Sequence, residues 1–270
     1  MNFIQALNTI WEKNNSLVCV GLDPDLRKIP QHLQDAEYPL FEFNRAIIDK
    51  TADLVCAYKP QIAYYAGAGL ERDLELTIEH IHTAHPGVPV ILDAKRGDIG
   101  STAEMYVMEA FERYKADAVT VNPYMGTDTL EPFLKRDDKG VVILCRTSNP
   151  GAVDFQDLDV GGQTLYQTVA HKAHTDWNRN GNVMLVVGAT YPEELGQIRA
   201  ITGDMPFLVP GIGAQGGDVE NAVRNGKDSR GTGMVINSSR GIIYASSGED
   251  FADAARAATL SLRDEINTHR

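Results

Sequence analysis

The sequence contains few cysteines, and they show no paired spacing. Three occur among 270 residues, Cys19, Cys56 and Cys145, and each lies within an apolar run. A disulfide framework requires regularly spaced cysteines, so we expect three buried, reduced thiols.

A surplus of positive charge is also missing. Lysine and arginine number 25 against 37 acidic residues, which gives a net charge of -12. Nonspecific binding of nucleic acid depends on a surplus of lysine and arginine, so we expect no nucleic-acid partner. An anionic substrate would need a local positive pocket against the field of the whole molecule.

Long apolar segments are absent as well. No apolar run approaches the roughly 20 residues that a membrane-spanning helix needs. The opening segment, MNFIQALNTIWEKNN, has neither the basic start nor the apolar stretch of a signal peptide. No low-complexity linker divides the chain. We therefore expect a soluble cytoplasmic protein with no membrane partner and a single domain over residues 1–270.

What the sequence does contain is a repeated alternation of short apolar runs and helix-like stretches. Each run fits a buried parallel strand. The runs are Leu17–Leu22, Leu54–Tyr58, Val88–Leu92, Ala118–Val121, Val141–Leu144, Val183–Val187, Phe207–Val209 and Met234–Ile236. The helix-like stretches include Leu70–Ala84, Thr102–Tyr114, Leu165–Trp177, Glu193–Ile201, Asp218–Arg224 and Asp250–Asn267. Because an eighth strand is present, the pattern favours an α/β (β/α)₈ TIM barrel over an open doubly wound sheet.

Three further segments have expected places in such a barrel. The opening helix, Phe3–Lys13 within residues 1–15, is expected to cover one end. Two long irregular stretches, Pro24–Leu40 and Thr147–Gln163, follow the first and fifth strands. Loops of this length inside a compact domain are often functional lids, and both would lie at the carboxyl ends of the strands.

One short motif places two carboxylates around a lysine, where the third apolar run ends: Asp93-Ala-Lys95-Arg-Gly-Asp98. Side chains alternate along a strand, so Asp93 and Lys95 are predicted to point the same way. A lysine held between carboxylates stays protonated and can deliver a proton to carbon, while a carboxylate can stress an anionic substrate. Taken alone, the motif is equally typical of a surface ion pair, and Asp98 could cap the next helix.

Other polar residues fall at the ends of predicted strands. Asp23 follows the first run, Lys59 the second, and Asn237-Ser-Ser-Arg240 the eighth. The carboxyl ends of all barrel strands meet at one rim, where polar residues are typically catalytic.

A glycine-rich segment follows the seventh run. Gly211, Gly213 and Gly216 satisfy G-x-G-x-x-G, but the dinucleotide motif belongs to a first βαβ unit with an acidic residue about 20 positions later. Bare glycine backbone before a helix instead indicates a phosphate site, to which Arg240 would add a bidentate cation.

Weaker candidates have simpler interpretations. His80, His82 and His85 do not share one helical face, and we expect solvated surface histidines rather than a metal site. Ser101-x-x-Glu104 matches a capping box and predicts a helix start.

Together these residues resemble the orotidine 5'-phosphate decarboxylases, specifically their longer bacterial subgroup. The shared motifs are Gly21-Leu-Asp23, Tyr58-Lys59-Pro60, Asp93-x-Lys95-x-x-Asp98-Ile99, Pro210-Gly-Ile-Gly-Ala-Gln215-Gly-Gly217 and Ser239-Arg240-Gly241. Related metal-dependent sugar-phosphate decarboxylases and hexulose-phosphate synthases carry a metal-binding glutamate at the end of the second strand. Lys59 cannot bind magnesium, so the resemblance implies an enzyme without metal or other cofactor.

The resemblance implies loss of carbon dioxide from orotidine 5'-phosphate to give UMP, the last step of UMP biosynthesis. Lys95 would stabilise the negative charge that develops at C6 of the pyrimidine and then protonate that carbon. Asp93 would face the substrate carboxylate. Lys59 and Asp98 would complete a row of alternating charges, and Asp23 would bind the ribose hydroxyls with Lys59.

The remaining implied roles concern binding. Asp98, Ile99 and Thr102 would reach into the site of a second subunit, which implies a homodimer with shared sites. Gln215 and Arg240 would bind the phosphate. Ser148 would read the pyrimidine ring, with Thr147 as the alternative.

Two other functions stay open from the residues themselves. Lys95 could form a Schiff base in a barrel aldolase, although flanking carboxylates would hold it protonated and poorly nucleophilic. The chain could also bind a phosphoribosyl ligand without catalysis, although a pure binder has no need of a buried proton donor.

Overall fold

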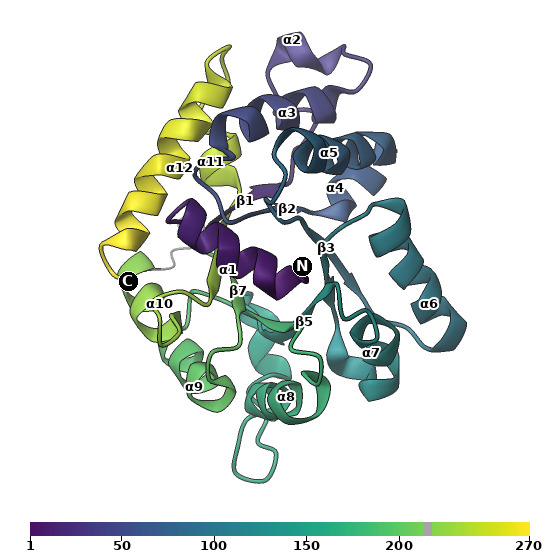
Figure 1. Cartoon of the computed structure of the whole chain (residues 1–270), viewed down its shortest axis with the longest axis vertical. Helices are drawn as coiled ribbons and strands as arrows, with labels where there is room; N and C mark the ends of the chain where they lie inside the picture. Colours follow the sequence, from purple (N-terminus) through teal and green to yellow (C-terminus); the bar gives the residue numbers. More distant parts are fainter. Residues whose placement is uncertain (213–217) are drawn as a thin grey trace.

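The computed structural model describes residues 1–212 and 218–270 as a barrel of parallel strands surrounded by helices (Figure 1). The strands are β1 Val18–Leu22, β2 Ala57–Pro60, β3 Ile91–Arg96, β4 Ala118–Val121, β5 Gly140–Arg146, β6 Val183–Val187, β7 Phe207–Pro210 and β8 Met234–Ser238. Their order is β2-β1-β8-β7-β6-β5-β4-β3. Isolated bridges from Tyr58 to Val90 and from Gln61 to Asp93 join β2 to β3. The sheet therefore meets itself, which confirms the TIM barrel and excludes the open sheet.

Helices cover the outside of the barrel (Figure 1). Those of the described chain are α1 Phe3–Lys13, α2 Gln31–Gln34, α3 Pro39–Thr51, α4 Ile62–Ala66, α5 Glu71–Ala84, α6 Gly100–Met108, α7 Thr127–Leu134, α8 Leu165–Lys172, α9 Pro192–Thr202, α10 Val219–Gly226, α11 Arg240–Ile243 and α12 Phe251–Asn267. Two π-helical turns, η1 Glu109–Arg113 and η4 Ala173–Trp177, continue α6 and α8. Two short 3₁₀ segments, η2 Pro123–Met125 and η3 Pro150–Asp154, lie in loops after β4 and β5.

α1 lies across the amino-terminal end of the barrel (Figure 1). Asn2 and Gln5 form a reciprocal capping box that starts the helix. The apolar face of α1 is buried. Burying a large apolar side chain, relative to leaving it exposed, stabilises the folded state by about 1.5–3 kcal/mol. A β-carbon at Gly140, where β5 begins, would overlap the Phe3 ring, so glycine is required for this close approach.

Five of the predicted strands end too early at the functional rim, whereas the strands that end at Leu22, Val121 and Val187 end as predicted. β3 was expected to stop at Leu92 and continues to Arg96, and β8 continues from Ile236 to Ser238. Hydropathy marks only the part of a strand that packs on both sides. Ladder pairing continues through polar residues, as between Pro210 and Asn237. Three of the extra residues of β3 and β8, Asp93, Lys95 and Asn237, line the site.

The predicted capping box of α6 is wrong. The helix begins at Gly100, its N-cap is Ile99, and no side chain caps it. Ser101 and Glu104 consequently lie inside the helix. Asp98 accepts a hydrogen bond from the Ile99 amide at 2.8 Å, so its carboxylate is outside the helix cap as well.

Candidate active site

The carboxyl ends of the strands enclose a cavity of about 520 Å³. Its polar lining comes from strands and loops far apart in the sequence. These residues are Asp23, Lys59, Tyr64, Asp93, Lys95, Thr120, Thr147, Ser148, Asn149, Asn237, Ser239 and Arg240. The strand-end residues therefore converge on one rim of the barrel, as the sequence predicts.

A row of alternating charges crosses the cavity wall. Lys59 Nζ lies 3.8 Å from Asp23 Oδ1 and 3.0 Å from Asp93 Oδ2. Lys95 Nζ lies 2.6 Å from the other oxygen of the same carboxylate, Asp93 Oδ1. Within the described chain the lysine between two carboxylates is therefore Lys59, whereas Lys95 contacts Asp93 and no ion pair joins it to Asp98.

Burial and charge act in opposite directions on this row. The side chains of Lys59 and Asp93 are only 5% and 11% exposed. Burial lowers the pKa of Lys59, but attraction to Asp23 and Asp93 outweighs it and raises that pKa above its ordinary value. Burial likewise raises the pKa of Asp93, but Lys59 and Lys95 outweigh it and hold that pKa well below its usual range. Lys59 and Asp93 are therefore both charged at neutral pH.

The backbone of β3 bulges where it carries Lys95. Pairing with β4 shifts register between Leu92 and Arg96, and Lys95 has a φ of 49°. The amides of Ala94 and Lys95 both donate to Thr120 Oγ1 at 2.9 Å, and this hydroxyl donates to Asp93 Oδ1 at 2.9 Å. Asp93 and Lys95 meet as expected, but through a bulge rather than simple strand alternation. The Lys95 side chain stays 46% exposed to the cavity.

The loop after β5 forms the opposite wall. The Thr147 hydroxyl donates to Asn149 Oδ1 at 2.7 Å and accepts from Gln156 Nε2 at 2.9 Å, so it is committed to bonds within the loop. A β-carbon at Gly188 would lie 2.8 Å from the Ser148 β-carbon. Glycine at the end of β6 is therefore what lets Ser148 line the cavity.

The loops after β7 and β8 form the third side. Gly211 has a φ of 101°, a left-handed conformation that favours glycine. Arg240 is exposed, begins α11, and makes no ion pair with any described residue. Gln215, the other predicted phosphate ligand, lies outside the described residues, as do Gly213 and Gly216.

Two buried oxygens in the cavity have no hydrogen-bond partner among the described residues. They are Asp23 Oδ1 and Asn237 Oδ1. Buried acceptors are normally satisfied, so these two atoms suit a ligand that brings hydroxyl or amide donors.

The predicted site residues of β3 and α6 divide into two groups. Asp93 and Lys95 line the cavity, whereas Asp98, Ile99 and Thr102 do not line the cavity of their own chain. Ile99 is 56% exposed and Thr102 is exposed.

Three site features were not predicted from sequence. Thr120 and Gly188 lie inside or beside ordinary apolar strands, and neither stands out by spacing. Asn237 follows the eighth apolar run, but its position alone indicates no role. A polar residue within a buried parallel strand, as at Thr120, is the one signal that could have indicated a contact with the site.

No helix in the described ranges combines the length and the apolar character that crossing a bilayer requires. A family model for "Orotidine 5'-phosphate decarboxylase / HUMPS family" matches residues 16–257. Proteins named orotidine 5'-phosphate decarboxylase from Azoarcus sp. (strain BH72) and Dechloromonas aromatica (strain RCB) are each 62% identical over the full length of both chains. The solved structure of Leishmania donovani OMP decarboxylase has a TM-score of 0.85 and 40% identity, covering 99% of this chain and 98% of that one.

Proposed function

The chain belongs to the orotidine 5'-phosphate decarboxylase / HUMPS family, and from that premise we propose that it converts orotidine 5'-phosphate to UMP and carbon dioxide with Lys95 as the proton donor. The observation that carries the proposal is the shared contact of Asp93 with two ammonium groups, Lys59 at 3.0 Å and Lys95 at 2.6 Å. One of these ammonium groups is buried and the other is open to the cavity.

The chemistry requires a charge stabiliser and a proton at one carbon. The bond from C6 to the carboxyl group breaks, carbon dioxide leaves, and the electron pair stays on C6. The Lys95 ammonium stabilises that pair and transfers a proton to C6, and the amine then takes a proton from water. The bond to Asp93 fixes the ammonium before substrate arrives, so little reorganisation is needed during the reaction. Asp93 faces the substrate carboxylate.

The proposed reaction uses no metal. Lys59 stands between the carboxylates that would otherwise be the natural ligands of a divalent cation, Asp23 and Asp93. Its ammonium supplies the positive charge at this position, and a second cation there would be repelled.

The rest of the cavity suits the rest of the substrate. Asp23 Oδ1, which accepts no hydrogen bond from the described residues, would accept one from a ribose hydroxyl. Ser148, which lines the cavity, would read the pyrimidine ring. Arg240 and Gln215 would hold the phosphate, and this remote binding would contribute to the chemical step.

We further propose a homodimer in which Asp98, Ile99 and Thr102 complete the neighbouring site. These residues lie outside their own cavity. The adjoining surface of α6 is apolar, with Met105 61% and Met108 52% exposed. An apolar surface of this kind favours a protein partner, and symmetry would place the same surface on both subunits.

The function is tested by following the ultraviolet absorbance of orotidine 5'-phosphate in the presence of a chelator. We expect turnover by the wild type and its loss in Lys95→Ala, with unchanged circular dichroism. No absorbance change with the wild type would overturn the decarboxylase assignment. Substantial activity in Lys95→Ala would overturn only the proton-donor role. An adduct trapped on Lys95 by borohydride would instead favour an aldolase.

A further inference from the structure

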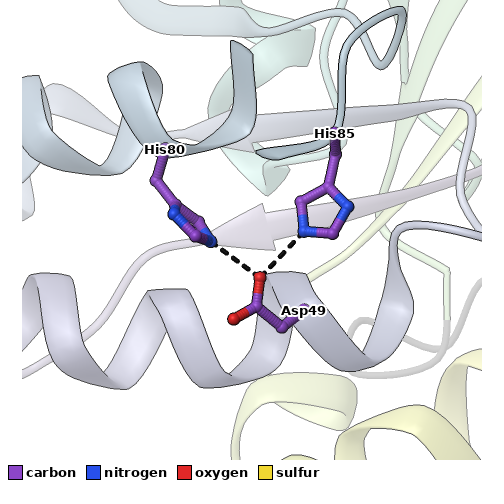
Figure 2. Close-up of side chains that lie close together, drawn as sticks. All are labelled: Asp49, His80 and His85. Carbon is purple, nitrogen blue, oxygen red and sulfur yellow. Dashed lines mark hydrogen bonds and ion pairs between the residues drawn. The ribbon is translucent and has the colours of Figure 1, made fainter. Parts of the chain in front are cut away.

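Two histidines and a carboxylate meet on the outer surface of the barrel, away from the cavity. Asp49 Oδ1 lies 2.7 Å from His80 Nε2 and 2.8 Å from His85 Nε2. Figure 2 shows both rings directed at the same oxygen, across the space between α3 and α5. The three ligand atoms all lie within 4.8 Å of one another.

This arrangement depends on where α5 ends. The spacing of His80, His82 and His85 predicted that the three do not share one helical face. His85, however, is the C-cap of α5 with φ −129° and ψ 59°, so the chain has already left the helix. Its ring turns back beside His80. His82 takes a different partner, Asp117, at 2.9 Å.

We propose that Asp49, His80 and His85 form a binding site for a borderline divalent cation such as Zn²⁺. Two imidazole nitrogens and one carboxylate oxygen are a donor set that zinc prefers, with ligand bonds of about 2.0–2.2 Å. The three side chains are already in contact, so they would need to move apart only slightly to hold a cation among these three atoms. The half-exposed carboxylate leaves water access for a fourth ligand.

The surroundings favour this site. Phe41 packs edge-on against the His80 ring, with ring centroids 6.1 Å apart, and restricts its rotation. Two nearby cations are already paired, Lys50 with Asp253 and Arg256 with Asp53. The net charge of -12 also favours cation binding.

The location indicates a role in stability rather than in catalysis. Asp49 lies near the end of α3, which leads into β2, and His85 ends α5, which leads into β3. Helix ends that lead into strands lie at the amino-terminal face of the barrel, opposite the active site. A bound cation would join α3 to α5 and stabilise the folded state.

The test uses the full chain without an affinity tag and titrates it with ZnCl₂ at about pH 7.5, since metal affinity falls at lower pH, where protons compete for the ligands. We expect saturable binding of one Zn²⁺ per chain and a higher Tm with zinc. His80→Gln, His85→Gln and Asp49→Asn should each weaken binding by at least ~10-fold and abolish the rise in Tm.

His82→Gln is the matched control, because this histidine lies on the same helix and also pairs with an aspartate. It should bind zinc as the wild type does. The proposal is overturned if His82→Gln weakens binding as much as the other variants. It is also overturned if His80→Gln and His85→Gln bind zinc as tightly as the wild type, or if the wild type does not bind at millimolar zinc. Cobalt substitution gives an independent readout, because the visible spectrum of Co²⁺ should change with the wild type and not with His80→Gln.

Discussion

A single hydroxyl, Thr120 Oγ1, holds together the carboxylate and the strained backbone of the site. It accepts from the amides of Ala94 and Lys95 and donates to Asp93, so its donor and acceptor capacity is fully used. The side chain is 1% exposed. Thr120→Val keeps its shape and removes all three bonds.

The expected cost can be worked out from these bonds. Loss of the bond to the Asp93 carboxylate costs about 1.5–3 kcal/mol, and each amide left without an acceptor costs about 1–3 kcal/mol when fully buried. Both amide hydrogen bonds are only partly buried, which lessens the second cost. We therefore expect a loss of roughly 2–4 kcal/mol in the free energy of unfolding.

We expect the catalytic rate to fall as well. With its two amides released, the bulge can relax and the Lys95 ammonium loses its fixed position. A misplacement of about 1 Å can cost ~100-fold in rate, so we expect kcat to fall by about that factor while KM changes less.

Urea denaturation and steady-state kinetics measure the two effects, with two controls. Thr120→Ser keeps the hydroxyl and should restore most of kcat. Thr129→Val removes a buried hydroxyl that bonds only Gly126 among described residues, so it should lower stability and leave kcat unchanged. If Thr120→Val matches Thr120→Ser in both stability and kcat, the positioning argument is wrong.

Two further outcomes follow from the charge row and the proposed dimer. The pKa of Asp93 is depressed in the folded state, so its stabilising contribution is full above the unfolded value of about 3.9 and is lost as pH falls towards the folded pKa. The difference in unfolding free energy between wild type and Asp93→Asn should therefore shrink below about pH 4 in denaturant titrations, and a constant difference would contradict the shift. Mixing inactive Lys95→Ala with inactive Asp98→Asn should restore about a quarter of wild-type activity, because exchange between dimers creates one intact shared site per heterodimer. No recovery after verified subunit exchange would place Asp98 in its own subunit's site.

The barrel could be predicted from sequence because each buried parallel strand leaves a short apolar run. The strand-end charges could be predicted for the same reason, since the last apolar residue locates the rim. Lys59 and Asp93 follow two different apolar runs, and only the predicted barrel fold indicates that they lie close together. Register, however, depends on bonds between strands, so the continuation of β3 to Arg96 left no hydropathy signal.

Side-chain geometry that depends on a local break could not be predicted. The predicted helix Leu70–Ala84 ends where α5 ends, but the meeting of His80 with His85 also depends on the backbone angles of His85 just beyond it, and neither spacing nor hydropathy reveals those. The contribution of Thr120 is similar, because its three partners are two backbone amides and a carboxylate on a neighbouring strand. No spacing rule connects positions 93 and 120.

The strained conformation of Lys95 links these observations. Asn15 and Lys115, the other non-glycine residues with positive φ in the described chain, follow helices, whereas Lys95 lies within a strand. A left-handed residue with a β-carbon costs about 1–2 kcal/mol, and glycine would avoid this cost. Glycine carries no ammonium, however, so a lysine at this position must be held in the strained conformation by its neighbours. Thr120 binds the backbone on one side of the bulge, and on the other side Arg96 pairs with Glu109 at 2.8 Å. Strain of this size persists only where surrounding bonds outweigh it, so substitution of the residues that enforce it should also lower kcat, as expected for Thr120→Val.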